Sequence, residues 1–157
     1  MHDIVQIMIP VVVVAVLYDL IIGLPWIGRP SKIVDGDSVE TITRRKLRRI
    51  RIGGIDAPEY KQDYGRTART AMVDLVEGRL VLFIPFGRDS RGRFLCVMVT
   101  TGGPVSWRMA LAGHAWPESF MTRILHVPAR MTRRGLWGGS AQLPSTWRRI
   151  NPWNGRR

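Results

Sequence analysis

The sequence predicts an α+β fold: a five-stranded β-barrel with about three helices, preceded by an N-terminal hydrophobic membrane segment. Five short runs of β-prone residues are bounded by turn signals, of which Asp35-Gly36 is the strongest. Residues 64–77 interrupt these runs with apolar side chains at helical spacing. Short strands with one inserted helix are typical of a small closed or partly open barrel.

In chain order, the sequence predicts three strands, a helix, two strands and two helices. Gly78 suits the position after the first helix, because glycine readily takes the left-handed conformation found there. Cys96 stands in an apolar run, so we expect a buried and unreactive thiol. The strands are expected at Ser31 to Val34, Ser38 to Thr43, Leu47 to Ile52, Arg79 to Pro85 and Arg93 to Thr100, and the later helices at Val105 to Ala112 and Pro128 to Arg134.

Three segments are expected along the chain: a hydrophobic segment over residues 1–25, one domain over residues 26–150 and a basic tail over residues 151–157. Residues 4–18 carry no charge, and about 20 residues suffice to span a bilayer as a helix. An uncleaved anchor is favoured, because the start of the chain lacks a firm positive charge and no small-x-small cleavage site is evident. A cleaved signal peptide and a soluble hydrophobic segment remain the alternatives.

Charge is the strongest signal in the composition, with a formal net charge of +12 and a pI near 11.4. Of the 24 basic residues, only Lys32, Lys46 and Lys61 are lysines, and the other 21 are arginines. Arginine presents a planar fork that binds phosphate through two parallel hydrogen bonds. A polyanionic partner is therefore expected, nucleic acid first and anionic lipid second. An arginine-rich proteome from a GC-rich genome is the alternative explanation.

The most informative motif is the stretch from Arg51 to Glu59, which reads Arg-Ile-Gly-Gly-Ile-Asp-Ala-Pro-Glu. It gathers a guanidinium and two carboxylates around a glycine pair and a proline that disfavour a helix. Such a group suits a site that holds a divalent cation and a phosphate together. The turn with Asp35 and Asp37 and the arginine at Arg93 extend the pattern. Each piece alone is more often a plain turn or a solvated charged loop.

Taken together, these motifs resemble the staphylococcal nuclease (thermonuclease) family over about residues 27–150. The order and spacing of the matching motifs make the resemblance specific. The residues that carry it are Val34 to Val39, Arg51 to Glu59, Tyr64-Gly65, Ala68, Gly78, Asp89, Gly92-Arg93, Gly113 to Trp116 and Arg134 to Trp137.

The resemblance implies an OB-fold barrel and a calcium-dependent nuclease that hydrolyses DNA and RNA to products with a 5′ hydroxyl and a 3′ phosphate. It implies that Asp37, Asp56 and the main-chain carbonyl of Ala57 bind Ca²⁺. Hard oxygen ligands of this kind suit Ca²⁺ or Mg²⁺, and the choice of Ca²⁺ rests on the family.

The resemblance also implies the roles of the remaining matching residues. Glu59 is the expected general base for the attacking water, or positions it. Arg51 and Arg93 are expected to grip the phosphate and stabilise the charge that grows on its oxygens. Asp35 is expected to brace the metal-binding turn.

Contacts to nucleic acid are expected at four further residues. Ser90-Arg91 replaces the lysine and tyrosine of the best-known family member, so Arg91 is expected to stack on a base in place of the tyrosine. Arg48 and Arg49 belong to a basic run that suits the phosphate backbone, with a solvated hairpin turn as the alternative. Trp116 loosely matches an aromatic base platform and is otherwise a core or rim residue.

Two other classes of function are compatible with the sequence. One is a binding module without catalysis, an OB-fold that holds single strands in a basic groove. The other is a membrane-surface protein whose basic charge meets anionic lipids, with the tail residues Trp147 to Arg157 contacting either lipid or nucleic acid. No obligate protein partner is implied.

The cellular location depends on the first segment. The expected location is the membrane, or a secreted or periplasmic one if the segment is cleaved. Arg29 and Lys32 follow the segment and favour a cytoplasmic domain, where a free nuclease would endanger the host's own nucleic acid. The side of the membrane stays open.

Overall fold

The computed structural model describes residues 23–43 and 45–152, together with the isolated residues 6, 10, 13, 14 and 17. The expected membrane segment and most of the basic tail therefore lie outside the described residues. Among the residues that are described, no helix combines the length and the apolar character needed to cross a bilayer.

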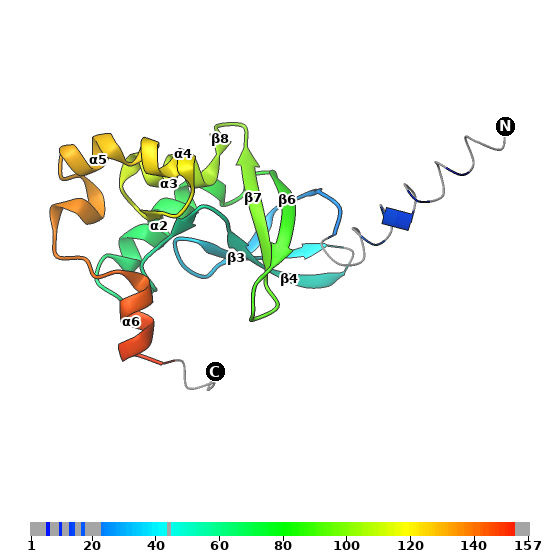
Figure 1. The fold of residues 1–157 in the computed structure, drawn as a ribbon, viewed down its shortest axis with the longest axis horizontal. Helices are drawn as coiled ribbons and strands as arrows, with labels where there is room; N and C mark the ends of the chain where they lie inside the picture. Colours follow the sequence, from blue (N-terminus) through cyan, green and yellow to red (C-terminus); the bar gives the residue numbers. More distant parts are fainter. Residues whose placement is uncertain are drawn as a thin grey trace.

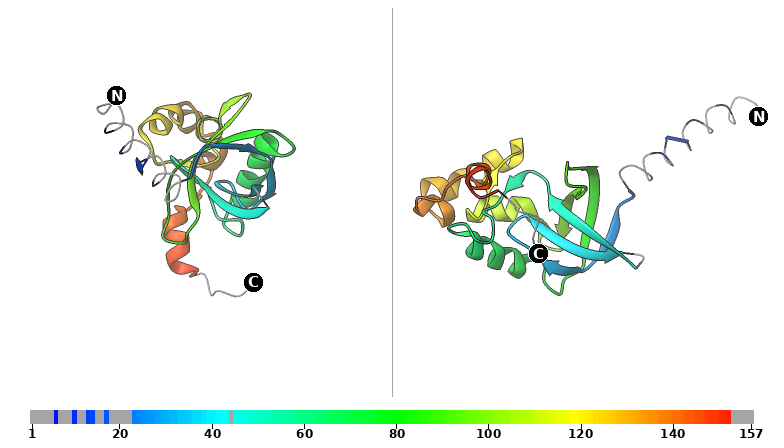
Figure 2. Two further views of the ribbon diagram at one scale, coloured as in Figure 1. Left: turned by 90° about the vertical axis from the view of Figure 1, so that its right-hand side faces the viewer. Right: turned by 90° about the horizontal axis from the view of Figure 1, so that it is seen from below.

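Four strands form the body of one strongly curved sheet: β3 (Ser38–Thr43), β4 (Lys46–Ile52), β6 (Val81–Arg88) and β7 (Phe94–Thr100). Neighbouring strands pair antiparallel, except that β4 and β7 run parallel. The two views of Figure 2 show these strands curling round instead of lying flat.

The segment that precedes β3 nearly closes this sheet into a barrel. Its first part, β1 (Trp26–Gly28), pairs with β6 at one edge, and its second part, β2 (Pro30–Ile33), pairs with β3 at the other edge. The hydroxyl of Thr41 donates a 3.0 Å hydrogen bond to the carbonyl of Arg29, where the segment changes partner. The predicted small barrel is confirmed as a nearly closed sheet, consistent with an OB-fold.

Every second side chain along the strands points into the barrel and fills its interior. On β4, Ile50 and Ile52 are fully buried, whereas Arg49 and Arg51, which alternate with them, point the other way. Cys96 on β7 is fully buried as predicted, and burial raises the pKa of its thiol to about 12 although Arg48 opposes the shift. The thiol is therefore protonated and unreactive near neutral pH.

Helices cover one end of the barrel (Figure 1). The predicted helix over residues 64–77 is confirmed as α2 (Gly65–Val76), whose Ala68, Met72 and Val76 pack in the core. Gly78 follows it with φ +67°, which confirms the predicted helix stop. The second predicted helix is α3 (Val105–Ala112), with the bounds that the sequence predicts.

The C-terminal part departs from the sequence prediction of about three helices. The helix predicted from Pro128 to Arg134 is shorter, α5 (Val127–Met131), and a 3₁₀ turn η1 (Gly135–Gly138) follows. Two helices were not predicted: α4 (Phe120–Leu125) and α6 (Pro144–Ile150). Both are short, and the apolar face of α4 points outward, with Phe120 77% exposed, so no core-facing periodicity marks it.

Two smaller differences concern the strands. The fourth predicted strand starts later and runs past Pro85 to Arg88, because a register shift between Pro85 and Gly87 lets the proline stand inside it. Four short strands were not predicted: β1, β5 (Ile55–Asp56), β8 (Gly103–Pro104) and β9 (Trp116–Pro117). The pairing of β5 with β9 positions the loop that carries the central motif.

Candidate active site

The turn between β2 and β3 carries the first two carboxylates. The N–H groups of Val34 and Asp35 donate to the carbonyl of Ser38, and a carboxylate oxygen of Asp35 accepts the N–H of Asp37 at 3.1 Å. Gly36 is required here, since a Cβ at this position would lie 2.7 Å from the Cβ of Ala57. The missing side chain lets the turn pack directly on the loop of the central motif.

The corner between β4 and β5 carries the third carboxylate. Gly54 makes the corner with φ +86°, and its carbonyl accepts a 2.7 Å hydrogen bond from the hydroxyl of Thr122. Asp56 then pairs with Trp116 across the β5–β9 ladder. Asp56 is thus held by main-chain pairing and not by a loose loop.

Arg51 links the two buried carboxylates. Its Nη1 donates to Asp37 at 2.9 Å and its Nη2 donates to Asp56 at 2.8 Å, with 15%, 3% and 10% of the respective side chains exposed. Burial alone would lower the pKa of the Arg51 guanidinium, but Asp37 and Asp56 outweigh this effect and raise the pKa above its ordinary value. The positive charge at this position is therefore permanent.

Arg93 joins the same group through Ser38. Its Nη1 donates to the hydroxyl of Ser38 at 3.1 Å, and that hydroxyl donates to the Asp37 carboxylate at 2.7 Å. Asp89 fixes the other side of the guanidinium, accepting from Nε at 2.7 Å. Burial tends to raise the pKa of Asp89, but the hydrogen bonds from Arg93 prevail and lower it.

Glu59 lies on the loop after β5, with 33% of its side chain exposed. Its main-chain N–H donates to the side chain of Gln62, whose amide in turn donates to the carbonyl of Gln142 in the segment before α6. The Glu59 carboxylate accepts a 2.9 Å hydrogen bond from Arg148 of α6. Arg148, which lies near the end of the described chain, therefore links Glu59 to the other acidic residues.

Arg148 is the site residue that sequence reasoning placed elsewhere, in a basic tail facing lipid or nucleic acid. Its guanidinium also donates to both oxygens of Asp56, at 3.2 Å and 3.0 Å. The neighbouring carboxylates raise the pKa of Arg148, although burial opposes them. The proline at the start of α6 was a possible helix signal, but no local pattern indicates which carboxylates the helix would meet.

Two further acidic groups adjoin the cluster. Burial first, and the nearby Asp37 carboxylate second, raise the pKa of Asp35 well above its usual range. Glu118, which was not predicted, lies 3.8 Å from the Arg51 guanidinium. Burial raises the pKa of Glu118, and the charge of Arg51 opposes the shift.

The four residues expected to contact nucleic acid have different surroundings, and of these only Trp116 pairs in a strand ladder with a carboxylate residue of the site, Asp56. Arg48 lies over the rings of Trp26 and Phe94, at 4.5 Å and 5.0 Å from their centroids. Arg49 is 70% exposed in its side chain and lies 3.6 Å from Glu40. Arg91 is exposed at the tip of the β6–β7 turn. Trp116 is half-buried against Trp137, with ring centroids 6.2 Å apart.

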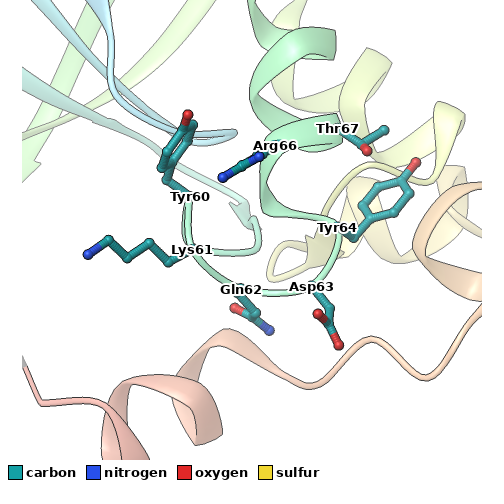
Figure 3. A pocket seen from close by; sticks show the side chains of 7 residues that line it. All are labelled: Tyr60, Lys61, Gln62, Asp63, Tyr64, Arg66 and Thr67. Carbon is teal, nitrogen blue, oxygen red and sulfur yellow. The ribbon is translucent and has the colours of Figure 1, made fainter.

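A surface pocket adjoins Glu59 (Figure 3). The ring of Tyr60 is 45% exposed there, with the guanidinium of Arg66 5.7 Å from its centroid. Gln62 and Asp63 point toward the C-terminal segment in Figure 3. The pocket is lined by Tyr60, Lys61, Gln62, Asp63, Tyr64, Arg66 and Thr67. It offers an aromatic ring and positive charge on the segment that follows Glu59 in the chain.

Within residues 23–43 and 45–152, no cluster of three or more His, Cys, Asp or Glu side chains has the arrangement of a metal site. The expected metal site uses two carboxylates and a main-chain carbonyl. The two carboxylates concerned, Asp37 and Asp56, are brought together on either side of Arg51.

The sequence is similar to known nucleases. The family model described as "Staphylococcal nuclease homologue" matches residues 49–138. An uncharacterized endonuclease of Escherichia coli is 41% identical over 128 residues, which cover 77% of this chain and 84% of the relative. A micrococcal nuclease of Shigella flexneri is 32% identical over 159 residues, 88% of this chain and 91% of the relative. A probable staphylococcal-like nuclease of Oryza sativa subsp. japonica is 34% identical over 124 residues, 75% of this chain and 33% of the relative.

Proposed function

The chain belongs to the staphylococcal nuclease family, and on that premise we propose that it is a calcium-dependent endonuclease acting on DNA and RNA. The family match and the relatives named nucleases make it an enzyme that hydrolyses phosphodiester bonds. The finer proposal is supported above all by the position of Arg51 between Asp37 and Asp56. This arrangement sets a phosphate-binding cation next to two hard oxygen ligands.

Asp37, Asp56 and the carbonyl of Ala57 are the proposed Ca²⁺ ligands, and the two carboxylates have room for a cation. A carboxylate offers about four lone-pair positions. Asp37 uses three of them, for Ser38, Ala57 and Arg51. Asp56 also uses three, for Arg51 once and for Arg148 twice. When bound, Ca²⁺ would neutralise charge on the phosphate and polarise it toward attack.

Arg51 and Arg93 are the proposed clamp for the phosphate. A guanidinium has five N–H donors, and the carboxylates take two of those of Arg51. Three donors remain for the oxygens of a phosphodiester. Arg93 is aligned by Asp89 and Ser38, so its own fork is preorganised. Preorganised cations stabilise charge that develops in the transition state. Each donor group of this kind commonly raises the rate by about 10²–10³-fold.

Glu59 is the proposed general base. In the proposed reaction, it accepts a proton from water while the water oxygen forms a bond to phosphorus. The bond between phosphorus and the 5′ oxygen breaks, and that oxygen takes a proton from solvent water and leaves as the 5′ hydroxyl, while Glu59 returns its proton to solvent. A partly exposed carboxylate beside a buried cluster of charged side chains suits this role, because water reaches the carboxylate from solvent.

The net charge of +12 supports a polyanionic substrate, and the exposed Arg49 is proposed to follow its backbone, whereas the exposed Arg91 is proposed to stack on a base. Arg48 and Trp116 remain proposed contacts with the nucleic acid. An increase in KM with unchanged kcat in the corresponding alanine variants is the expected sign of such contacts.

The test is cleavage of single-stranded DNA and RNA by the full-length chain, with Ca²⁺ and with EDTA. We expect cleavage only with Ca²⁺, and Glu59→Gln to reduce turnover by about 10²–10⁴-fold. Glu77→Gln is the matched control, because Glu77 is an exposed carboxylate at the end of α2. Salt-sensitive binding without turnover by the wild-type chain would instead indicate a non-catalytic binding module.

We also propose that residues 1–25 anchor the enzyme in a membrane, or direct its export if they are cleaved. The support is the uncharged run over residues 4–18. Fractionation of cells that express the chain, with the mass of its N-terminal peptide, distinguishes the two outcomes. A full-length chain in the fraction without membranes would contradict the proposal.

A further inference from the structure

Helix α6 lies beyond the part of the chain that matches the family model, yet it reaches the candidate active site. The family match ends at residue 138, whereas α6 spans Pro144–Ile150. From this helix Arg148 forms three hydrogen bonds to two carboxylates, Asp56 and Glu59. Only 29% of the Arg148 side chain is exposed. The contact is therefore a partly buried, forked ion pair of the stronger kind.

The position of Arg148 is fixed by the fold around it. Pro144 at the start of α6 is buried, and the amide of Gln62 holds the carbonyl of Gln142 just before it. Figure 1 shows α6 lying apart from α4 and α5, so these contacts attach it to the loop that carries Glu59. The helix and this loop are consequently one structural unit.

Glu59 depends on this contact more than the other acidic residues do. Asp37 and Asp56 are each held by Arg51, and Asp37 also by Ala57 and Ser38. Within residues 23–43 and 45–152, Arg148 is the only donor to the Glu59 carboxylate. Without it, a one-third exposed side chain would sample several rotamers.

We propose that Arg148 is a positioning residue of the nuclease, which aims the Glu59 carboxylate and balances the charge of Asp56 before a cation binds. The inference rests on the proposed role of Glu59 as the general base. The charges support it, since in the described part of the chain the three carboxylates of Asp37, Asp56 and Glu59 form direct ion pairs with two guanidinium groups, those of Arg51 and Arg148. Arg148 also fills two lone-pair positions of Asp56.

Removal of Arg148 should therefore move two properties in opposite directions. Turnover should fall about 100-fold with little change in KM. Misplacement of a reacting group by about 1 Å has an effect of this size. Cation affinity should rise about tenfold, the size of effect that a neighbouring unit charge has on a carboxylate. Loss of structure would instead weaken both properties together.

The experiment compares the full-length wild-type chain with Arg148→Ala, Arg148→Lys and the matched control Arg123→Ala. Arg123 is an exposed arginine on the short helix α4, so the control removes the same charge. Cation affinity is measured with Tb³⁺, a luminescent substitute for Ca²⁺, in the absence of nucleic acid. Turnover is measured with Ca²⁺ and single-stranded DNA, with and without guanidinium ion added to Arg148→Ala.

We expect tighter Tb³⁺ binding and slower turnover in Arg148→Ala, partial recovery by lysine or added guanidinium, and wild-type behaviour in the control. Unchanged Tb³⁺ affinity and turnover in Arg148→Ala would overturn the inference, as would weaker binding in a variant with a wild-type circular dichroism spectrum. Failure of the proposed function would appear in the wild-type chain itself, as cleavage that EDTA does not stop or no cleavage. The Tb³⁺ titration still decides the charge-balancing role in that case.

Discussion

Arginine serves two different purposes in two regions of this molecule. In the carboxylate cluster (Asp37, Arg51, Asp56, Glu59 and Arg148), each guanidinium hydrogen-bonds to two carboxylates. In the ring cluster (Trp26, Arg48, Arg88 and Phe94), guanidinium groups lie over aromatic rings at 3.9–5.0 Å from the centroids. The first arrangement fixes charges for chemistry, and the second covers the apolar surface of the barrel. Substitutions in the two regions should therefore separate activity from stability.

Among the arginine substitutions that compare the two regions, Arg51→Lys in the carboxylate cluster should have the largest effect. Lysine keeps the charge but cannot span Asp37 and Asp56 with one rigid fork, so we expect turnover to fall by about 10²–10³-fold. The measurement is kcat with Ca²⁺ and single-stranded DNA. Arg49→Lys, on the same face of β4, is the control and should keep wild-type kcat. Equal losses in both variants would show that the cluster has no special role.

A smaller effect is expected from Ser38→Ala, which breaks the link between Arg93 and Asp37. Hydrogen bonds to charged groups contribute about 1.5–3 kcal/mol, so we expect turnover to fall by about 10–100-fold. Ser31→Ala is the control, because that hydroxyl donates to the main-chain carbonyl of Glu40 on the neighbouring strand. Wild-type kcat in Ser38→Ala would show that Arg93 acts without the link.

Arg48→Ala in the ring cluster should change stability and not kcat. Loss of its contacts with Trp26 and Phe94 is expected to lower the free energy of unfolding by about 1–2 kcal/mol. Urea denaturation measures the change in the free energy of unfolding. A measurement of kcat on the same preparation shows whether turnover is unchanged. A rise in KM alone would reveal the proposed contact with nucleic acid, whereas a fall in kcat would remove the distinction between the two regions.

The smallest effect is expected from a group outside both regions. Burial lowers the pKa of His114 below its ordinary value of 6.5, against the opposing charge of Asp74, and the hydroxyl of Tyr64 lies 2.8 Å from its Nδ1. Because its pKa is lower in the folded protein, His114 binds a proton more readily in the unfolded chain. The contribution of neutral His114 to stability is therefore complete above pH 6.5. It is lost as the pH falls through the lower pKa of the folded state.

His114→Gln should therefore flatten the loss of stability between pH 7.5 and about pH 5. Urea denaturation of both proteins at the two pH values measures it. An unchanged slope would mean that other groups carry the pH dependence.

Local patterns predicted most of the barrel. The strand Ser38–Thr43 and the helix Val105–Ala112 have the predicted bounds, because alternation and helical spacing there coincide with burial. Gly36 and Asp37 were identified from the turn and the resemblance, and Asp37, Asp56 and Arg51 do lie together. Their catalytic and metal-binding roles remain predictions.

The parts that could not be predicted depend on contacts between distant segments. The closing of the barrel requires one segment, residues 26–33, to change partner from β6 to β3, which no local pattern encodes. Arg148 meets Asp56 across 92 residues of sequence. In the sequence it is one arginine among 21, so only the fold distinguishes it from its exposed neighbour Arg149.

The attachment of α6 has a consequence for the order of synthesis. Translation produces Asp37, Arg51, Asp56 and Glu59 early, but Arg148 comes 89 residues after Glu59. If Arg148 aims the general base, a chain that is still being synthesised lacks this alignment of Glu59 until α6 has been made.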